Sequence, residues 1–308
     1  MTIRVPLAVF AAIALLGCAA CSRDDGPSGA GDCTSDGSTA HRDLRYSEAP
    51  GTSAGMQSLD LYVPDRTSGC DRPTPLVVYV HGGAFAAGDK ANKVGDKVRL
   101  FTGEGWAFAS LNYRLVGKPG AGPTRGVYPA AEQDVADAVA YLADHAEDYD
   151  LDPTHVTLLG HSAGAFLVAL VGTDATFLSR AGLSLDDVAC VVPVDTTYDI
   201  PQQVAEGGLE GAMFRNAFGD DRTTWKQRSP TGNVVSDAGV PAFYVLTRGD
   251  RARVAQARAF AEQLAAAGVD AQAVVVPGLS HDEVNDVIGE PGDIAVTPDL
   301  MTFLRGCL

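Results

Sequence analysis

The chain has 308 residues, 46% of them hydrophobic, and a formal net charge of −16 at pH 7. This length and apolar fraction predict one domain with a substantial buried core, with two small domains as the alternative. The negative charge argues against nucleic acid as a partner and against electrostatic binding to an anionic membrane, because no basic cluster offsets it.

The N-terminus has the pattern of a targeting segment. Arg4 precedes an apolar run, residues 5–16, which is too short to span a bilayer and fits the hydrophobic region of a signal peptide. The run ends in Leu15-Leu16-Gly17-Cys18, which resembles a bacterial lipobox, and this resemblance implies a signal peptide over 1–18 and a lipidated Cys18. The alternative is an ordinary signal peptide that is cut nearby, with Cys18 removed. We expect a protein that is lipid-anchored to the outer face of a bacterial membrane or secreted, with membrane contact only through the N-terminal anchor.

The next segment, residues 19–40, is polar and glycine-rich without apolar periodicity, which predicts a flexible tether before a domain over 41–308. Apart from Cys18 and the nearby Cys21, four cysteines remain, and an exported chain uses an even set of cysteines for disulfides. Of the three possible connectivities we expect Cys33–Cys70, pinning the N-terminal arm, and Cys190–Cys307, tying the C-terminal helix to the sheet. No cysteine and histidine spacing typical of a metal site is present, so no metal is predicted.

The first predicted buried strand, residues 75–80, runs directly into His81-Gly82-Gly83-Ala84-Phe85. Two glycines at the carboxyl end of a strand allow backbone N–H groups to face a ligand. In acyl transfer such N–H groups, here those of Gly82, Gly83 and Ala163, stabilise the oxyanion of the tetrahedral intermediate. The alternative is a glycine turn that only ends the strand. Phe85, beside these glycines, is a candidate wall of the substrate pocket.

Two further elements follow. Residues 107–111 predict a strand that leads into Asn112-Tyr113-Arg114. From Pro129 a helix is predicted, because apolar residues recur at helical spacing on one face. This alternation of strands and helices is typical of a parallel α/β sheet.

The strongest motif is Gly160-His161-Ser162-Ala163-Gly164, which fits G-x-S-x-G. It follows a predicted strand, residues 156–159, and opens a predicted helix, residues 163–171. A strand, a sharp turn and a helix in this order hold a serine nucleophile at strained backbone angles, with glycines that permit close backbone packing.

The chain resembles the α/β-hydrolases of the carboxylesterase type, near bacterial feruloyl and acetyl esterases, hormone-sensitive-lipase-like enzymes and kynurenine formamidases. The resemblance rests on His81-Gly82-Gly83, Asn112-Tyr113-Arg114, residues 160–164 and Ser280-His281, and it covers about residues 55–308. It implies the α/β-hydrolase fold, a mostly parallel central sheet flanked by helices. It also implies a Ser, acid, His triad in chain order and no metal or organic cofactor.

Only one of the six histidines, His281, follows Ser162 in the chain. It lies in a loop after the apolar run at 273–276, where the family has its general base. We therefore predict that His281 accepts the proton of Ser162. A surface-loop histidine is the alternative.

Two aspartates are candidates for the triad acid. Asp250 follows the predicted strand 242–246 and lies 31 residues before His281, and we favour it. However, relatives show a G-x-x-D type of loop there, whereas here the aspartate comes directly after Gly249. Asp195, at the end of the predicted strand 190–194, is the alternative acid. Either aspartate is equally suited to cap a helix or form a turn.

The long stretch 196–240, after the sixth strand, shows no clear strand and predicts a small cap-like insertion on the ligand-binding rim. Tyr198, Phe214 and Phe218 are candidates for a substrate pocket or, equally, for a local hydrophobic cluster. His161 is a further pocket candidate.

These features predict a serine hydrolase that cleaves small-molecule carboxylic esters through an acyl-enzyme. An amidase or formamidase would use the same triad. A peptidase of this type usually carries a larger additional domain. A non-catalytic hydrolase-fold binding protein is the remaining alternative, although the intact serine, histidine and glycine motif argue against it. The oligomeric state is not predicted.

Overall fold

The computed structural model describes residues 33–50, 52–53, 55–65, 70, 72–117 and 126–308. The predicted signal peptide, Cys18 and most of the predicted tether lie outside these residues. Asp32–Leu308 form one compact unit. The first strand of this unit begins at Ser38, within the last residues of the segment 19–40 that the sequence predicts as a tether.

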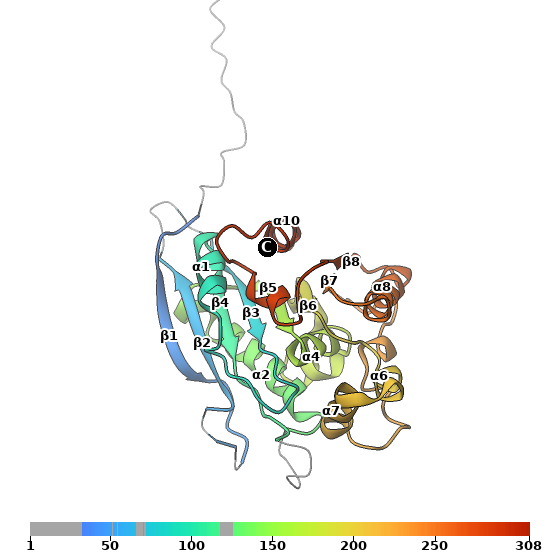
Figure 1. Ribbon diagram of the computed structural model, residues 1–308. Coiled ribbons are helices and arrows are strands. Elements are labelled where there is room, and N and C mark those ends of the chain that lie inside the picture. Colours follow the sequence, from blue (N-terminus) through green and yellow to red (C-terminus); the bar gives the residue numbers. More distant parts are fainter. Residues whose placement is uncertain (1–32, 51, 54, 66–69, 71, 118–125) are drawn as a thin grey trace, which may run out of the picture. The chain divides into compact units, whose positions relative to one another are not determined.

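An eight-stranded sheet runs through the described part of the chain in the order β1-β2-β4-β3-β5-β6-β7-β8 (Figure 1). β2 pairs antiparallel with both β1 and β4, and every other neighbouring pair is parallel. The strands are β1 (Ser38–Arg45), β2 (Ser58–Pro64), β3 (Thr74–Val80), β4 (Ala107–Leu111), β5 (Leu151–His161), β6 (Cys190–Val194), β7 (Ala242–Thr247) and β8 (Ala271–Val275).

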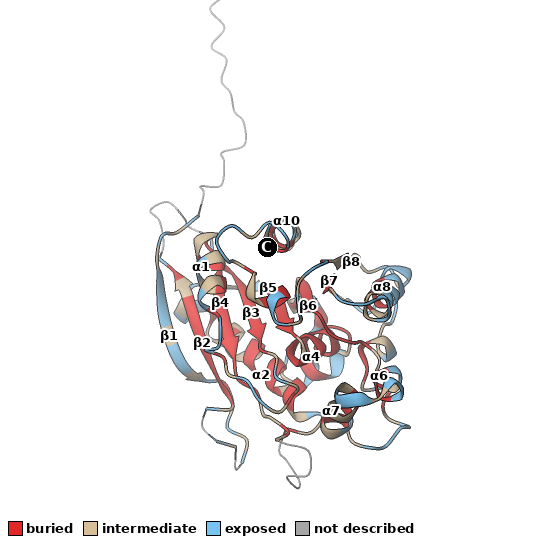
Figure 2. Cartoon of the chain, viewed as in Figure 1, coloured by how far each residue is buried: buried red, intermediate tan, exposed pale blue. Residues whose placement is uncertain are grey.

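The central strands are apolar throughout because both faces of the sheet are covered. In β3, Leu76, Val78 and Val80 enter one core cluster, whereas Val77 and Tyr79 enter the other. Successive side chains of a strand point to opposite faces, so a strand buried on both sides needs an unbroken apolar run. Figure 2 shows β3 and β5 buried and the edge strand β1 exposed.

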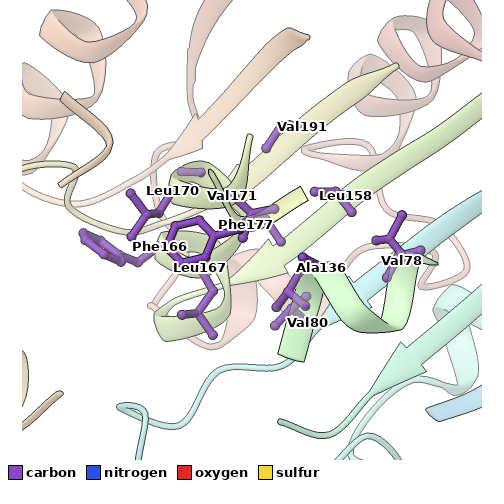
Figure 3. Close-up of a cluster of buried hydrophobic side chains, with 14 of the residues drawn as sticks. Val78, Val80, Ala136, Leu158, Phe166, Leu167, Leu170, Val171, Phe177 and Val191 are labelled. Atoms are coloured by element: carbon purple, nitrogen blue, oxygen red, sulfur yellow. The ribbon is translucent and has the colours of Figure 1, made fainter. Parts of the chain in front are cut away.

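Helices cover the two faces of this sheet. α2, α4 and α8 contribute to one core cluster, and α1 and α10 contribute to the other. Figure 3 shows side chains of α4, among them Phe166 and Leu167, in one buried cluster with Val80 of β3 and Ala136 of α2. Each large apolar side chain that is fully buried in this way stabilises the fold by about 1.5–3 kcal/mol. The helices are α1 (Gly95–Gly103), α2 (Ala130–Asp144), α3 (Ala146–Tyr149), α4 (Ala163–Val171), α5 (Ala175–Arg180), α6 (Ile200–Glu206), α7 (Gly208–Phe218), α8 (Arg251–Ala266), α9 (Glu283–Asp286) and α10 (Thr297–Cys307).

This architecture confirms the predicted fold class, a mostly parallel central sheet flanked by helices. The chain between β6 and β7 forms α6, α7 and a short 3₁₀ turn, Pro230–Gly232. A second 3₁₀ turn, Leu185–Asp187, precedes β6. Sequence analysis did not single out β1 and β2, because their alternating polar residues lack the continuous apolar run of the central strands.

Two disulfides join distant parts of the fold. Cys33 pairs with Cys70, and Cys190, the first residue of β6, pairs with Cys307 at the end of α10. Both pairs are those we expected from the sequence. A crosslink across 117 residues restricts the unfolded chain strongly, so the second disulfide stabilises the attachment of α10 to the sheet.

Candidate active site

The candidate groups meet at one edge of the sheet. The glycine motif follows β3, Ser162 follows β5, Asp195 follows β6 and His281 lies in the loop after β8. Because these strands are parallel, their carboxyl ends share an edge, which is where open α/β sheets bind ligands.

Ser162 occupies a sharp turn between β5 and α4. Its backbone has φ +55° and ψ −116°, a conformation that costs energy for a residue with a side chain. The turn is possible because its flanking glycines lie against other backbone. A Cβ on Gly160 would overlap the carbonyl of Gly164, and a Cβ on Gly164 would overlap the carbonyl of Val80. The result is a serine hydroxyl held above the end of the sheet.

A hydrogen-bonded chain joins three side chains at this point. His281 Nε2 lies 2.8 Å from Ser162 Oγ, and His281 Nδ1 lies 2.6 Å from Asp195 Oδ2. With Nδ1 protonated and bonded to the carboxylate, Nε2 is free to accept the proton of the serine hydroxyl. This is the geometry of a nucleophile, a base and an acid that orients the base.

Asp195 is the acid of this hydrogen-bonded chain, although the sequence favours Asp250 for that role. Its side chain is fully buried. Burial raises the pKa of the Asp195 carboxyl, but the hydrogen bond with His281 and the positive charge of Arg248 outweigh that effect, so the pKa lies below its usual value. Asp195 is therefore an ionised carboxylate in the interior, as the role of orienting a histidine requires.

Asp250, the acid we favoured, has a different role. It is the N-cap of α8, and its Oδ1 accepts hydrogen bonds from the N–H groups of Ala252 (2.9 Å) and Arg253 (3.0 Å). These backbone hydrogen bonds lower the pKa of the exposed carboxyl. An aspartate directly before a helix satisfies otherwise free N–H groups, and this local demand explains its position better than catalysis does.

The glycine loop presents unused backbone donors next to Ser162. A Cβ on Gly82 would lie 3.1 Å from the Cβ of Ser162, which shows how closely the loop approaches the nucleophile. No hydrogen bond within the described residues uses the N–H groups of Gly82, Gly83 or Ala163. Ala163 is the first residue of α4, where a helix leaves its N–H groups unpaired. These three groups can donate to an oxyanion.

Contacts of His81 and Tyr113 hold the glycine loop in place. Their rings stack with centroids 4.6 Å apart, and the Tyr113 hydroxyl donates to the His81 carbonyl at 3.0 Å. His81 Nδ1 lies 2.7 Å from the carbonyl oxygen of Gly82. The histidine of the glycine motif and the tyrosine of Asn112-Tyr113-Arg114 therefore support the loop, and His81 also lines the cleft beside Ser162.

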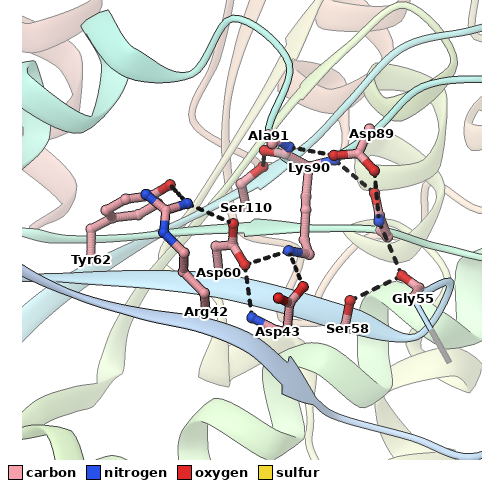
Figure 4. Close-up of polar contacts among 11 residues, drawn as sticks. Arg42, Asp43, Gly55, Ser58, Asp60, Tyr62, Asp89, Lys90, Ala91 and Ser110 are labelled. Carbon is pink, nitrogen blue, oxygen red and sulfur yellow. Dashed lines mark hydrogen bonds and ion pairs between the residues drawn. The ribbon is translucent and has the colours of Figure 1, made fainter.

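The far end of the same loop is anchored by Lys90 (Figure 4). This buried side chain forms ion pairs with Asp60 and with Asp43 (Nζ–Oδ1 2.8 Å). The Lys90 backbone donates to Asn112 Oδ1 at 2.7 Å and accepts from the Ser110 hydroxyl at 2.7 Å. No sequence pattern indicates these contacts of Lys90, because its partners come from β1, β2 and the end of β4, which are separate segments of the chain.

His161 contacts the loop of His281 rather than acting as an acid or base. Its Nε2 lies 2.8 Å from the carbonyl oxygen of His281, so that nitrogen carries the proton and donates it to the hydrogen bond. Burial, together with the neighbouring His281 ring, lowers the pKa of His161 to about 4. A neutral His161 avoids a second positive charge beside His281 when the latter is protonated.

Two cavities open onto Ser162. The smaller, about 30 Å³, lies between Phe85 and the α7 residues Met213 and Phe214. The larger is a cleft of about 620 Å³, lined by the glycine loop, His161, Asp282, Asn285 and Asp286, among others. Phe85 and His161 thus lie where we expected pocket residues.

Tyr198 lies outside both cavities. Its ring is buried and stacks on Phe260 of α8 with centroids 4.2 Å apart. The expectation that Tyr198 lines the substrate pocket is wrong, because the chain turns inward after β6 and carries this side chain into the core. Phe218 is likewise buried, in an aromatic cluster with Phe85 and Phe214.

The described residues contain neither a cluster of metal ligands nor a helix suited to span a membrane. No three histidine, cysteine, aspartate or glutamate side chains there are grouped so that they could hold a metal ion. None of the helices described is both long enough and apolar enough to cross a membrane.

Residues 59–192 match the family model BD-FAE. Esterase LipQ of Mycobacterium tuberculosis is 30% identical over 216 residues, which cover 67% of this chain and 48% of LipQ. The probable carboxylic ester hydrolase LipM of the same organism is 28% identical over 201 residues, 62% of this chain and 44% of LipM. This chain spans about half the length of these curated relatives.

Solved structures share the fold. A truncated carbohydrate esterase from gut microbiota superposes with a TM-score of 0.69 at 20% identity, covering 90% of this chain and 98% of that one. Esterase B from Lactobacillus rhamnosis gives a TM-score of 0.70 at 20% identity, covering 89% and 87%. At this identity the solved structures show that the chain has the α/β-hydrolase fold, and the sequence matches above are to proteins named as esterases.

Proposed function

We propose that this protein is a serine carboxylesterase. The observation that carries the proposal is the chain Asp195–His281–Ser162, with the unused N–H groups of Gly82, Gly83 and Ala163 beside the serine. The relatives LipQ and LipM, which are named as an esterase and a probable ester hydrolase, support the same assignment.

In the acylation step Ser162 Oγ attacks the ester carbonyl carbon while His281 Nε2 takes the hydroxyl proton. The carbonyl π bond breaks, and the resulting oxyanion accepts hydrogen bonds from the three backbone N–H groups. Collapse of this intermediate breaks the bond to the alcohol oxygen, and His281 returns its proton to that oxygen. The products are an alcohol and an acyl-enzyme on Ser162.

Deacylation repeats these steps with water in place of the serine. His281 takes a proton from the water as the water attacks the acyl carbon, and then gives that proton to Ser162 Oγ as the acid leaves. Asp195 stays ionised throughout and stabilises the protonated His281. No cofactor takes part in this proposal.

The cavities favour an ester with one small half. The small space between Phe85, Met213 and Phe214 fits a short acyl group, whereas the wide cleft accepts a larger alcohol half. We therefore propose small-molecule esters of short-chain acids as substrates.

The test is a panel of p-nitrophenyl esters from C2 to C12, assayed with the purified full chain and with Ser162→Ala. We expect turnover by the wild type only, with an optimum at short chains. Formyl amides are assayed in parallel, because the same triad also cleaves amides. Turnover of amides but not esters would replace this proposal with an amidase, and no turnover of either would leave a binding protein.

We also propose that the protein is exported and held at a membrane through lipid on Cys18. The lipobox-like Leu15-Leu16-Gly17-Cys18 supports this, and two disulfides suit an oxidising compartment. Incorporation of labelled fatty acid into the full chain, compared with Cys18→Ser, tests the anchor. Labelling of both chains, or of neither, would contradict it.

A further inference from the structure

Arg248 makes a second contact to the triad acid that the reaction above does not use. It follows β7 directly, and its Nε donates to Asp195 Oδ2 at 2.6 Å. The same oxygen receives the hydrogen bond of His281 Nδ1, also at 2.6 Å. The other oxygen, Oδ1, is buried without a hydrogen-bond partner in the described structure. Both donors therefore act on one oxygen and fix the rotation of the carboxylate.

The backbone brings Arg248 to this place. Val194 of β6 pairs with Leu246 of β7, and the N–H of Asp195 donates to the Leu246 carbonyl at 2.8 Å. Asp195 and Arg248 thus leave neighbouring strands at the same edge of the sheet. The end of β7, where the sequence led us to expect the acid, supplies a cation that binds the acid at the end of β6.

The other charged groups near this pair are accounted for by contacts of their own. Arg253 of α8 is bonded to Glu210 of α7, with both Nη2–O distances at 2.8 Å. His161 of β5 donates to the His281 backbone, and Asp282 beside His281 is exposed. On the other face of the sheet, Lys97 of α1 is buried and donates to the Asn285 carbonyl. Of the cations, Arg248 alone is in direct contact with the Asp195 carboxylate among the described residues.

A fully buried carboxylate requires compensation of its charge and of its lost hydration. Neutral His281 donates one hydrogen bond to this carboxylate, but it compensates the negative charge only when it is protonated, which occurs transiently in each half-reaction. The guanidinium group of an arginine keeps its positive charge in proteins. Arg248 therefore keeps Asp195 ionised in the resting state, when the imidazole is neutral.

We propose that Arg248 is a positioning residue of this active site, holding the Asp195 carboxylate ionised and turned toward His281. This role rests on the esterase function proposed above. It also sets the lower pH limit of activity. Without Arg248, the Asp195 carboxylate loses a neighbouring positive charge and binds a proton more readily, so the inactive protonated state extends to higher pH.

The test compares Arg248→Met, Arg248→Lys and the control Arg251→Met on a short-chain p-nitrophenyl ester. Arg251 is exposed, and its substitution by methionine removes the same charge three residues away from Arg248. For Arg248→Met we expect kcat to fall about 10- to 100-fold with KM unchanged, as for other groups that orient a functional side chain. The acid limb of the kcat profile moves up by about one pH unit. We expect Arg248→Lys to have the acid limb of the wild type but only part of its kcat. Arg251→Met should match the wild type in both.

Folding and function are separated by titrating Ser162 with a fluorescent phosphonate, so that rates are expressed per reactive site. An unchanged acid limb and an unchanged rate per site in Arg248→Met would overturn the proposal, even if fewer sites were folded. A wild type that turns over no ester would instead contradict the esterase function itself.

Discussion

The two sides of the catalytic serine are built differently. On one side the loop 81–90 and the turn 160–164 are held by buried contacts, such as those of Lys90 and Tyr113, and by direct contact of backbone with backbone. On the other side α7 is attached to α8 by side chains near the surface, with Glu210 bonded to Arg253 and Glu206, at the end of α6, bonded to Gln256.

The ends of α7 reinforce this contrast. Gly207 and Gly208, at its start, have φ +77° and +65°, and no atom lies within 4 Å of a Cβ built on either. No other atom occupies the space beside these two glycines, and glycine adopts such backbone angles without strain, so this joint is less constrained than the turn at Ser162. The chemical groups are therefore fixed by the interior, whereas the α7 wall of the small pocket combines the buried Phe214 with partly exposed contacts to α8. Mutations on the two sides should therefore fail in different ways.

The largest effect is expected from Ser162→Ala on the rigid side. Removal of the nucleophile lowers kcat by about 10⁴-fold or more, because the acyl-enzyme cannot form. The chain should remain folded, since the hydroxyl makes its hydrogen bond only to His281. Turnover and phosphonate labelling measure the change, with the exposed Ser179→Ala as control. If Ser162→Ala kept a rate near that of the wild type, another residue would have to be the nucleophile.

Asp195→Asn is expected to have the next largest effect. The amide cannot hold His281 in the tautomer that accepts the serine proton, and kcat falls by about 10⁴-fold in the best-studied triad. Asp250→Asn is the matched control, because asparagine also caps helices and should leave kcat near the wild-type value. If the two variants exchanged these outcomes, the acid assigned by the structure would be wrong.

The contrast between these two aspartates shows what the sequence can predict. Ser162, the glycine loop and His281 could be found because each lies in a short contiguous motif or is unique by position in the chain. The acid could not be found in this way, because β6 and β7 are each followed by an aspartate at the same edge of the sheet. Which carboxylate reaches His281 depends on three-dimensional packing. The one local signal was that Asp250 stands directly before a helix, where a capping role is common.

The same reasoning covers the rest of the fold and site. The central strands and their helices were predicted because burial on two faces requires unbroken apolar runs. The contacts of Lys90 and Arg248 could not be predicted, because each side chain binds a residue in a different strand region, 30 or more positions away in the chain. Tyr198 was misplaced because an aromatic residue after a strand has the same sequence pattern whether it faces a pocket or the core.

The buried His161 gives the rigid side a pH dependence of its own. Its pKa is about 4 in the folded chain, below the ordinary value of 6.5, so the unfolded chain binds more protons between these values. Stability is then fully present above about pH 6.5 and is lost as pH falls toward 4, by up to about 3 kcal/mol. Urea unfolding of the wild type and His161→Asn at pH 7 and pH 4.5 measures this. Equal pH dependence in both would contradict it.

The smallest effect is expected on the α7 side. Glu210→Gln or Arg253→Met removes the ion pair that joins α7 to α8 above the small pocket, and partly exposed pairs contribute only about 0–1 kcal/mol. We expect little change in stability or in the rate on acetate. The ratio of rates on hexanoate and acetate should rise a few-fold, because Met213 and Phe214 can then move away from Ser162.

Glu206→Gln is the control for this last experiment, since it weakens another contact to α8 at a residue that does not line the pocket. An unchanged acyl preference in all three variants would mean that the small pocket is as rigid as the serine side. A changed preference for the alcohol half, with the acyl preference unaltered, would assign the small pocket to the leaving group. Either result would correct the contrast drawn between the two sides of the serine.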